Sequence, residues 1–275
     1  MNDFNTKPYP SILQSVGIIG IVILGMIFFG PIMLLGEFIG EEPTTLIYYL
    51  LAMGIPLWII YAVKRVYMRD VSFNYRIKNK RIIPYMLIAT IGLQFALTIP
   101  LSNLLPMPDW AKEMFEQLAG KASNIYMFLT LVVAAPILEE FIFRGIMLNG
   151  LLKKYSPHKA IIVSSILFGF VHLNPWQFIS AFILGLFIGW IYYKTRSLSL
   201  AIIIHAFNNF TATLPTLMGV TDEPIEENLI DMAGGPINLA LIIISAASVL
   251  ILSLYLIQKE FNRVKPEKDK IEADK

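Results

Sequence analysis

Long stretches of apolar residues follow one another along the chain, separated by short polar segments. A helix that crosses a hydrocarbon core of roughly 30 Å needs about 20 predominantly apolar residues. The pattern meets this requirement eight times and predicts spans at about residues 11–35, 44–63, 82–105, 125–150, 160–174, 176–193, 197–218 and 236–258. We therefore expect an all-α polytopic membrane protein with about eight transmembrane helices.

The composition also indicates a membrane protein. The 275 residues are 56% hydrophobic and only 15% charged, which is too apolar for an ordinary soluble domain. The first apolar stretch is longer than that of a signal peptide and lacks an A-x-A-like cleavage site, so we expect a permanent helix. Cysteine is absent, which excludes disulfides, thiolate nucleophiles and cysteine-ligated zinc.

Basic residues are distributed unequally between the predicted loops. All but three of the 22 Lys and Arg residues fall on one side of the bundle, and the exceptions are Lys112, Lys121 and Arg144. The positive-inside rule makes the basic side cytoplasmic, and an even number of spans then places both termini there. We expect an integral protein of the plasma membrane of a prokaryote, with membrane lipid as a partner and no nucleic acid.

The chain shows no repeats and no segment typical of a separate soluble domain. We expect one transmembrane domain over residues 1–260 and a charged, disordered cytoplasmic tail over residues 261–275. Between the third and fourth spans, Trp110, Met114 and Leu118 are spaced four apart, which predicts a short amphipathic helix. A connector resting on the outer lipid interface is the favoured interpretation of this helix, and a lid over a site is the alternative.

Three ionisable residues lie inside the fourth span, in the stretch AAPILEEFIFRG at residues 134–145. A charged group in mid-span costs roughly 2.5–3.5 kcal/mol on insertion scales, so such groups usually face a bundle interior and pair with a partner. Glu140 and Arg144 are four residues apart in the favourable order for a salt bridge. Glu139 is turned about 100° from Glu140 and should find its partner on another helix. Pro136 removes a backbone donor and should loosen the helix here.

Two further polar motifs lie in later spans: FGFVH, which ends at His172, and HAFNN, which runs from His205 to Asn209. Counted from the nearest cytoplasmic basic residue, Glu139, His172 and Asn209 each lie roughly 20 Å deep, and His205 lies one turn shallower. Taken singly, the ion pair could be a structural clamp, and a buried histidine or asparagine is usually a packing contact between helices. The common depth on three helices favours one site inside the bundle.

These side chains permit hydrolysis of a peptide bond by an activated water. A carboxylate and an imidazole in a partly desolvated cavity can bind a water and take its proton, and a His/Asn pair can stabilise the oxyanion that follows. Ser164 and Ser165 show no nucleophile elbow or relay, which argues against a serine mechanism. Zinc held by Glu139, His172 and His205 is the competing possibility, but the HExxH pattern is absent. We expect no cofactor.

The three motifs EEFIFR, FGFVH and HAFNN occur in this order on separate spans. They resemble the EExxxR, FxxxH and HxxxN signatures of the CPBP, or CAAX-protease, family of intramembrane glutamic endopeptidases. The resemblance covers roughly residues 125–212. It implies four residues at the chemistry: Glu139 as the catalytic base, His172 as its partner on the water, and His205 and Asn209 as the oxyanion hole. It implies three supporting residues: Glu140, Arg144 and Phe168, the last lining the site.

The resemblance implies a peptide or protein substrate, which in some family members is prenylated. Eukaryotic and archaeal members remove the last three residues after a prenylated cysteine. Bacterial members act in other processes, including peptide maturation and self-immunity to bacteriocins. Two other functions stay open. Buried Glu/His chains also mark ion pathways, so a membrane transporter or proton relay is one alternative, although no repeat supports it. A non-catalytic bacteriocin self-immunity protein is the other.

Overall fold

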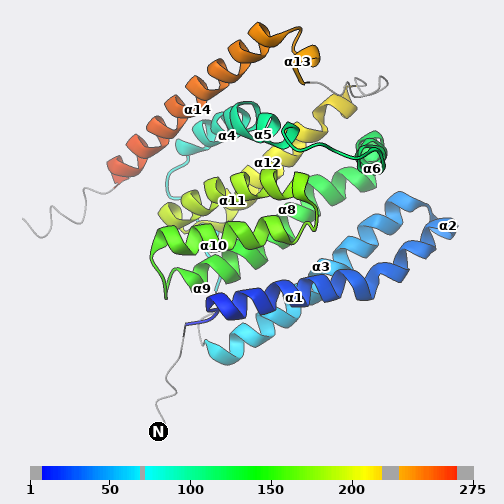
Figure 1. The fold of residues 1–275 in the computed structure, drawn as a ribbon. Coiled ribbons are helices and arrows are strands. Elements are labelled where there is room, and N and C mark those ends of the chain that lie inside the picture. Colours follow the sequence, from blue (N-terminus) through cyan, green and yellow to red (C-terminus); the bar gives the residue numbers. More distant parts are fainter. Residues whose placement is uncertain (1–7, 69–71, 219–228, 265–275) are drawn as a thin grey trace, which may run out of the picture. The chain divides into compact units, whose positions relative to one another are not determined.

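A computed structural model of the protein describes residues 8–68, 72–218 and 229–264. All regular structure in these three ranges is helical, with no strand among them, which confirms the predicted all-α fold (Figure 1). The charged tail expected from residue 261 falls mostly outside the described residues, because the last described helix ends at Val264.

Seven helices in the described part of the chain are long and apolar enough to cross a membrane, and the chain is an integral membrane protein. They are Ile12–Ile39, Glu41–Tyr67, Ile82–Asn103, Ile125–Leu151, Pro175–Thr195, Leu198–Leu217 and Pro236–Arg263. The span predicted at 160–174 is instead helix α10 (Pro157–Phe170), whose 14 residues extend for about 21 Å. That length falls short of a hydrocarbon core of roughly 30 Å. The apolar run continues past α10, but the residues that follow form a turn.

The helices fall into two units. One contains residues 1–75 and 107–225, and the other contains residues 76–106 and 226–275. All the motif residues of the fourth, fifth and seventh predicted spans belong to the first unit. The site can therefore be described from this unit alone.

The first unit begins with a pair of packed helices, seen side by side in Figure 1. The first helix consists of α1 (Ile12–Phe29), η1 (Gly30–Leu35) and α2 (Gly36–Ile39), and the second is α3 (Glu41–Tyr67). A Cβ atom on Gly25 would lie 2.4 Å from Cγ of Pro56, so only glycine lets the two backbones come this close. This close packing fixes the position of α3, which contributes a side chain to the site.

The short amphipathic helix predicted before the fourth span is present as α6 (Asp109–Gly120), followed by η3 (Lys121–Ser123). Trp110 on α6 contacts Trp176 edge to face, with ring centroids 6.1 Å apart. Trp110 remains 63% exposed. This helix therefore rests on the start of α11 (Pro175–Thr195) through one aromatic pair.

The fourth span is one continuous helix with two widened segments. It consists of α7 (Ile125–Phe128), η4 (Leu129–Ala134), α8 (Ala135–Glu140), η5 (Phe141–Leu148) and α9 (Asn149–Leu151), of which η4 and η5 are π-helical. A π-helix bonds each N–H to the carbonyl five residues earlier, and such segments occur often at functional sites. Pro136 stands at the start of α8, so the predicted loosening takes the form of a wider turn just before the glutamates.

Helices α10 and α11 form a tight hairpin, and α12 (Leu198–Leu217) follows them (Figure 1). A Cβ atom on Gly185 of α11 would lie 3.1 Å from Cβ of Ser165 on α10. The turn between the two helices contains His172 and Leu173, and Leu173 has a left-handed φ of 57°. Asn174 closes the turn, since its side chain accepts from the backbone N–H of Gln177 at 2.8 Å and caps α11.

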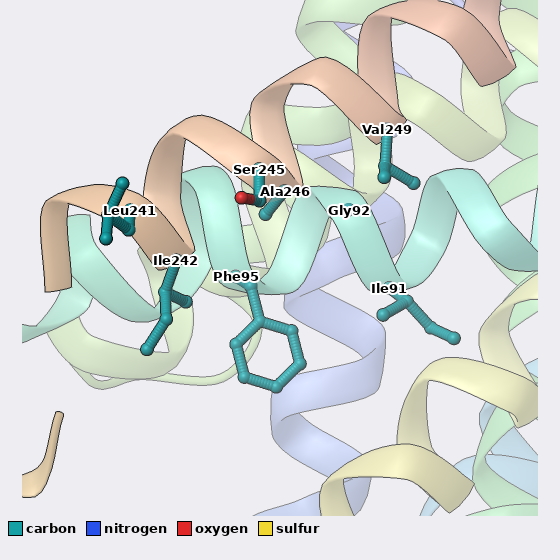
Figure 2. Close-up of a pocket in the computed structure, with 8 residues that line it drawn as sticks. All are labelled: Ile91, Gly92, Phe95, Leu241, Ile242, Ser245, Ala246 and Val249. Atoms are coloured by element: carbon teal, nitrogen blue, oxygen red, sulfur yellow. The ribbon is translucent and has the colours of Figure 1, made fainter. Parts of the chain in front are cut away.

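The second unit is built around α14 (Pro236–Val264), which packs along α4 (Ile82–Leu93). It also contains η2 (Gln94–Thr98), α5 (Ile99–Asn103) and α13 (Leu229–Met232). Figure 2 shows an apolar groove between α14 and the α4–η2 helix, lined by Ile91, Gly92, Phe95, Leu241, Ile242, Ser245, Ala246 and Val249. The one polar side chain in this lining is a serine, so the groove offers no charged group for catalysis.

Candidate active site

The fourth span and α12 bring three polar side chains into one buried cluster. Oε1 of Glu140 accepts hydrogen bonds from Nη1 of Arg144 and Nδ1 of His205, each at 2.8 Å. Glu140 is fully buried, and Arg144 is only 1% exposed. The predicted salt bridge between Glu140 and Arg144 is confirmed. Arg144 also donates through Nη2 to the Gly185 carbonyl at 3.2 Å, which ties α11 to the cluster.

Glu139 lies beside this cluster but outside the salt bridge, as its position on the helix predicted. Its Oε1 accepts a hydrogen bond from the Tyr49 hydroxyl on α3 at 2.5 Å. Its Oε2 lies 3.8 Å from Nε2 of His205. That oxygen is buried and has no hydrogen-bond partner among the described residues. Glu139 therefore keeps one oxygen held and one oxygen available toward His205.

The proton positions on His205 follow from its partners. A carboxylate only accepts hydrogen bonds, so Nδ1, which faces Glu140, carries a proton. The opposite nitrogen, Nε2, faces Glu139 and is an acceptor in the neutral ring and a donor in the charged ring. With His205 charged, two carboxylates balance one guanidinium and one imidazolium in this buried cluster. A charge-balanced cluster carries a smaller burial penalty than an unpaired charge.

Phe168 packs against the side chains of all three motifs. Its ring lies edge to face with His172 and His205, with centroids 5.4 and 5.5 Å apart. The Arg144 guanidinium lies over the same ring, 4.6 Å from its centroid. Phe168 is 1% exposed, so it fixes these groups from the interior.

His172 contacts Phe168 through both its ring and a hydrogen bond. Its Nδ1 is 2.9 Å from the Phe168 carbonyl oxygen, and a carbonyl only accepts, so Nδ1 carries the proton. Nε2 of the neutral ring is then left as an acceptor. No hydrogen bond or ion pair joins His172 to Glu139 or Glu140 in the described part of the chain.

The Asn209 side chain contacts the backbone of the fourth span. Its Nδ2 donates to the Leu131 carbonyl at 2.8 Å, and its Oδ1 accepts from Nδ2 of Asn208. The N–H of Ala135 bonds to Thr130, five residues back, so the next donor in this register would be residue 136. That residue is Pro136, which has no N–H. Asn209 therefore supplies the donor that the proline removes, and one amide hydrogen stays available for another acceptor.

The two serines of α10 do not join the cluster. Ser164 donates to the Phe143 carbonyl at 3.4 Å and Ser165 donates to the Ile161 carbonyl at 2.8 Å. Among the described residues, no three His, Asp or Glu side chains are arranged to hold a metal ion. In particular, the three side chains of the zinc alternative, Glu139, His172 and His205, do not form such a group.

The sequence patterns did not point to Tyr49. This residue lies on α3, in a span that carries no motif and no charged residue near its middle. A tyrosine hydroxyl is not charged, so it did not mark the span as one that needs a buried partner. The available signal was weak: Tyr48 and Tyr49 are adjacent hydroxyl-bearing residues inside an apolar run. Only the packing of α3 against the fourth span distinguishes Tyr49 from Tyr48.

Comparison with known protein families gives one finding for this region. Residues 121–211 match the family model described as Type II CAAX prenyl endopeptidase Rce1-like. No curated protein and no solved structure matches the chain. The matched segment runs from η3 into α12 and contains all three motifs, whereas α3 and Tyr49 lie outside it.

Proposed function

We propose that the protein is an intramembrane glutamic endopeptidase that uses an activated water, and the match of residues 121–211 to the Rce1-like type II CAAX prenyl endopeptidase family supports this. One observation carries the proposal: the free Oε2 of buried Glu139 faces Nε2 of His205 at 3.8 Å. The basic oxygen and the His205 donor are therefore neighbours, which suits attack by a water held on Glu139 at a carbonyl whose oxygen is held by His205. Family membership supports a peptide or protein as the substrate.

Glu139 is the general base of this mechanism. It takes a proton from the water, and the resulting hydroxide attacks the carbonyl carbon of the scissile peptide bond. The tetrahedral intermediate then collapses with cleavage of the C–N bond. Glu139 returns the proton to the leaving nitrogen, so that the products are a carboxylic acid and an amine.

The two histidines have complementary parts, which their Nδ1 partners support. His172 keeps its Nδ1 proton on a carbonyl, so Nε2 is free to accept from the attacking water. His205 has Nδ1 held by Glu140, and its charged form donates from Nε2 to the developing oxyanion. The second amide hydrogen of Asn209 is the further donor. Glu140, Arg144 and Phe168 hold His205 in place.

The substrate is a membrane-associated peptide, and a prenylated C-terminus is the form the family points to. Lys153, Lys154 and Lys159 lie at the open end of α10, and Lys194 and Arg196 lie at the open end of α11. The positive-inside rule favours a cytoplasmic position for both ends of this hairpin. The hairpin then enters and leaves the membrane on the same side. The termini therefore keep the sides that the eight-span topology gives them. We keep both termini on the cytoplasmic side of a prokaryotic plasma membrane.

The test compares wild type with Glu139→Ala in proteoliposomes, with a quenched farnesylated peptide ending in a CAAX sequence as the reporter. Loss of the base should reduce the cleavage rate by at least about 100-fold, a typical contribution of general base catalysis. Ser164→Ala is the control, because that hydroxyl bonds a backbone carbonyl away from the glutamates. In parallel, proteomics of C-terminal and internal peptides from cells with each form identifies the natural substrate.

Full cleavage by Glu139→Ala would overturn the mechanism. We expect activity to persist in strong chelator and the purified protein to carry no stoichiometric zinc. One zinc per chain, lost in His172→Ala, would replace the glutamate mechanism with metal catalysis. Proton-coupled uptake without cleavage would favour a transporter instead. Bacteriocin protection that survives loss of Glu139, His172 and Asn209 together would favour the immunity protein.

A further inference from the structure

We infer that Tyr49 is a positioning residue for Glu139: its hydroxyl holds one carboxylate oxygen and stabilises the ionised form that takes the proton from water. The contact joins Tyr49 Oη to Glu139 Oε1 at 2.5 Å, within the range of charge-assisted O–H···O⁻ bonds. The inference rests on the proposed role of Glu139 as the base. It extends the site to α3, which lies outside the segment matched by the family model.

The hydrogen bond affects which oxygen of Glu139 can reach a water. With Oε1 held by Tyr49, the carboxylate plane is fixed, and Oε2 is the oxygen that faces His205. A carboxylate without this donor is free to rotate about its terminal torsion, which is broad for glutamate. Tyr49 therefore sets the direction of the basic oxygen toward the site.

The hydrogen bond also affects the charge of Glu139. A donor to a carboxylate favours its ionised form, and burial disfavours it. Besides Tyr49, the groups that face Glu139 are His205 on α12 and the neighbouring ion pair of Glu140 with Arg144 on its own helix. Tyr49 is the only one of these that donates a hydrogen bond to Glu139 in the described part of the chain.

The neighbouring tyrosine offers a matched control. Tyr48 also lies on α3, and its hydroxyl donates to the Met26 carbonyl of α1 at 3.3 Å. Tyr48→Phe and Tyr49→Phe therefore remove the same atom from adjacent positions of one helix, and both keep the aromatic ring for packing. Only Tyr49→Phe removes a hydrogen bond to Glu139.

The experiment follows the protonation of Glu139 by infrared spectroscopy on the purified full-length protein in detergent, over a pH series. The carboxyl band of Glu139 is identified by its loss in Glu139→Gln. In Tyr49→Phe the midpoint of this titration should move to higher pH by about one unit, as expected from loss of one hydrogen bond to a charged group. In Tyr48→Phe the midpoint should stay at the wild-type value.

The same variants are then assayed for peptide cleavage. Below the wild-type midpoint, Tyr49→Phe should be about tenfold slower than wild type, because a smaller fraction of Glu139 is ionised there. Its kcat should recover at higher pH, with KM unchanged, since Tyr49 holds the base and not the peptide. A variant that was merely misfolded would be slow at every pH.

Two results would overturn the inference: an unchanged Glu139 midpoint in Tyr49→Phe, or an equal displacement in Tyr48→Phe. The infrared measurement needs no substrate, so its outcome is separate from the proposed function. If the midpoint moves in Tyr49→Phe but Glu139→Ala still cleaves peptide, the hydrogen bond to Glu139 is supported and the role of Glu139 as base is rejected. If the midpoint does not move and Glu139→Ala is inactive, the role of Glu139 as base is supported and the role of Tyr49 as its positioning residue is rejected.

Discussion

The fourth span and α14 have similar lengths, 27 and 28 residues in their membrane-spanning parts, but very different surroundings. Half of the most apolar window of residues 125–151 is buried within the protein, whereas only 17% of that window is buried in α14. The mean hydropathies of the two windows are 1.9 and 2.6, so the more buried window is the less apolar one. The more buried helix is the one that holds Glu139, Glu140 and Arg144.

The difference shows where a membrane protein can keep charge. Every charged group in the fourth span has a partner from another helix, such as the His205 imidazole or the Gly185 carbonyl. Lipid could supply none of these hydrogen bonds. In α14 the ionised side chains Glu260 and Arg263 stand near the end of the helix and pair with each other. Its middle part presents the apolar groove of Figure 2.

The largest expected effect comes from breaking the buried ion pair. Arg144→Ala should lower the free energy of unfolding by about 3–5 kcal/mol, because Glu140 would keep its charge without its guanidinium. The measurement is SDS-induced unfolding in mixed micelles. In Glu140→Leu/Arg144→Met, two apolar side chains of similar volume should restore at least about half of that loss. A loss below about 1 kcal/mol in Arg144→Ala would show that the pair does not stabilise the helix as proposed.

A smaller effect is expected at the widened turn. Asn209→Ala should cost about 1–2 kcal/mol, because the half-buried Leu131 carbonyl loses its donor. Pro136→Ala returns a backbone N–H at the position that would bond Leu131 in the same register. In that background Asn209→Ala should cost at least about 0.5 kcal/mol less, which a double-mutant cycle of unfolding free energies measures.

The cycle also separates the structural from the catalytic role of Asn209. If its amide stabilises the oxyanion, the double variant regains stability but not cleavage activity. Strictly additive unfolding energies would show that Pro136 and Asn209 do not share the Leu131 carbonyl.

The smallest effect is expected in the groove of the second unit. Ser245→Ala should change the free energy of unfolding by less than about 0.5 kcal/mol and leave peptide cleavage unchanged, as is usual for substitutions away from buried polar networks. The measurements are the same unfolding titration and cleavage assay. A tenfold change in cleavage would instead assign the groove a part in substrate binding.

Much of the fold followed from apolar length alone. Seven of the predicted spans are helices that can cross the bilayer, because a run of about 20 apolar residues has few alternatives in a membrane. The span predicted at residues 160–174 was the exception. Its hydropathy could not reveal that α10 stops at Phe170, since that end depends on a turn with a left-handed Leu173 and on the Asn174 cap of α11.

The site was predictable as far as one helix determines it. The spacing of Glu140 and Arg144 predicted their salt bridge, and the angle between the glutamates predicted that Glu139 would stand apart from it. Contacts between helices were not predictable in this way. Depth alone could not show that His205 bonds Glu140 or that Asn209 bonds Leu131, because depth does not specify how each helix is rotated.

The sequence by itself determined the membrane class, seven of the eight predicted spans, the ion pair and the three motifs, because these depend on hydropathy and on spacing along one helix. Tertiary structure alone decided which oxygen of Glu139 is free, which nitrogen of each histidine carries a proton, and that Tyr49 holds the carboxylate. The physical reason is that hydrogen bonds depend on atomic distances and directions between helices. Those distances are set by close contacts such as Gly25 with Pro56 and Gly185 with Ser165, which join residues far apart in the sequence.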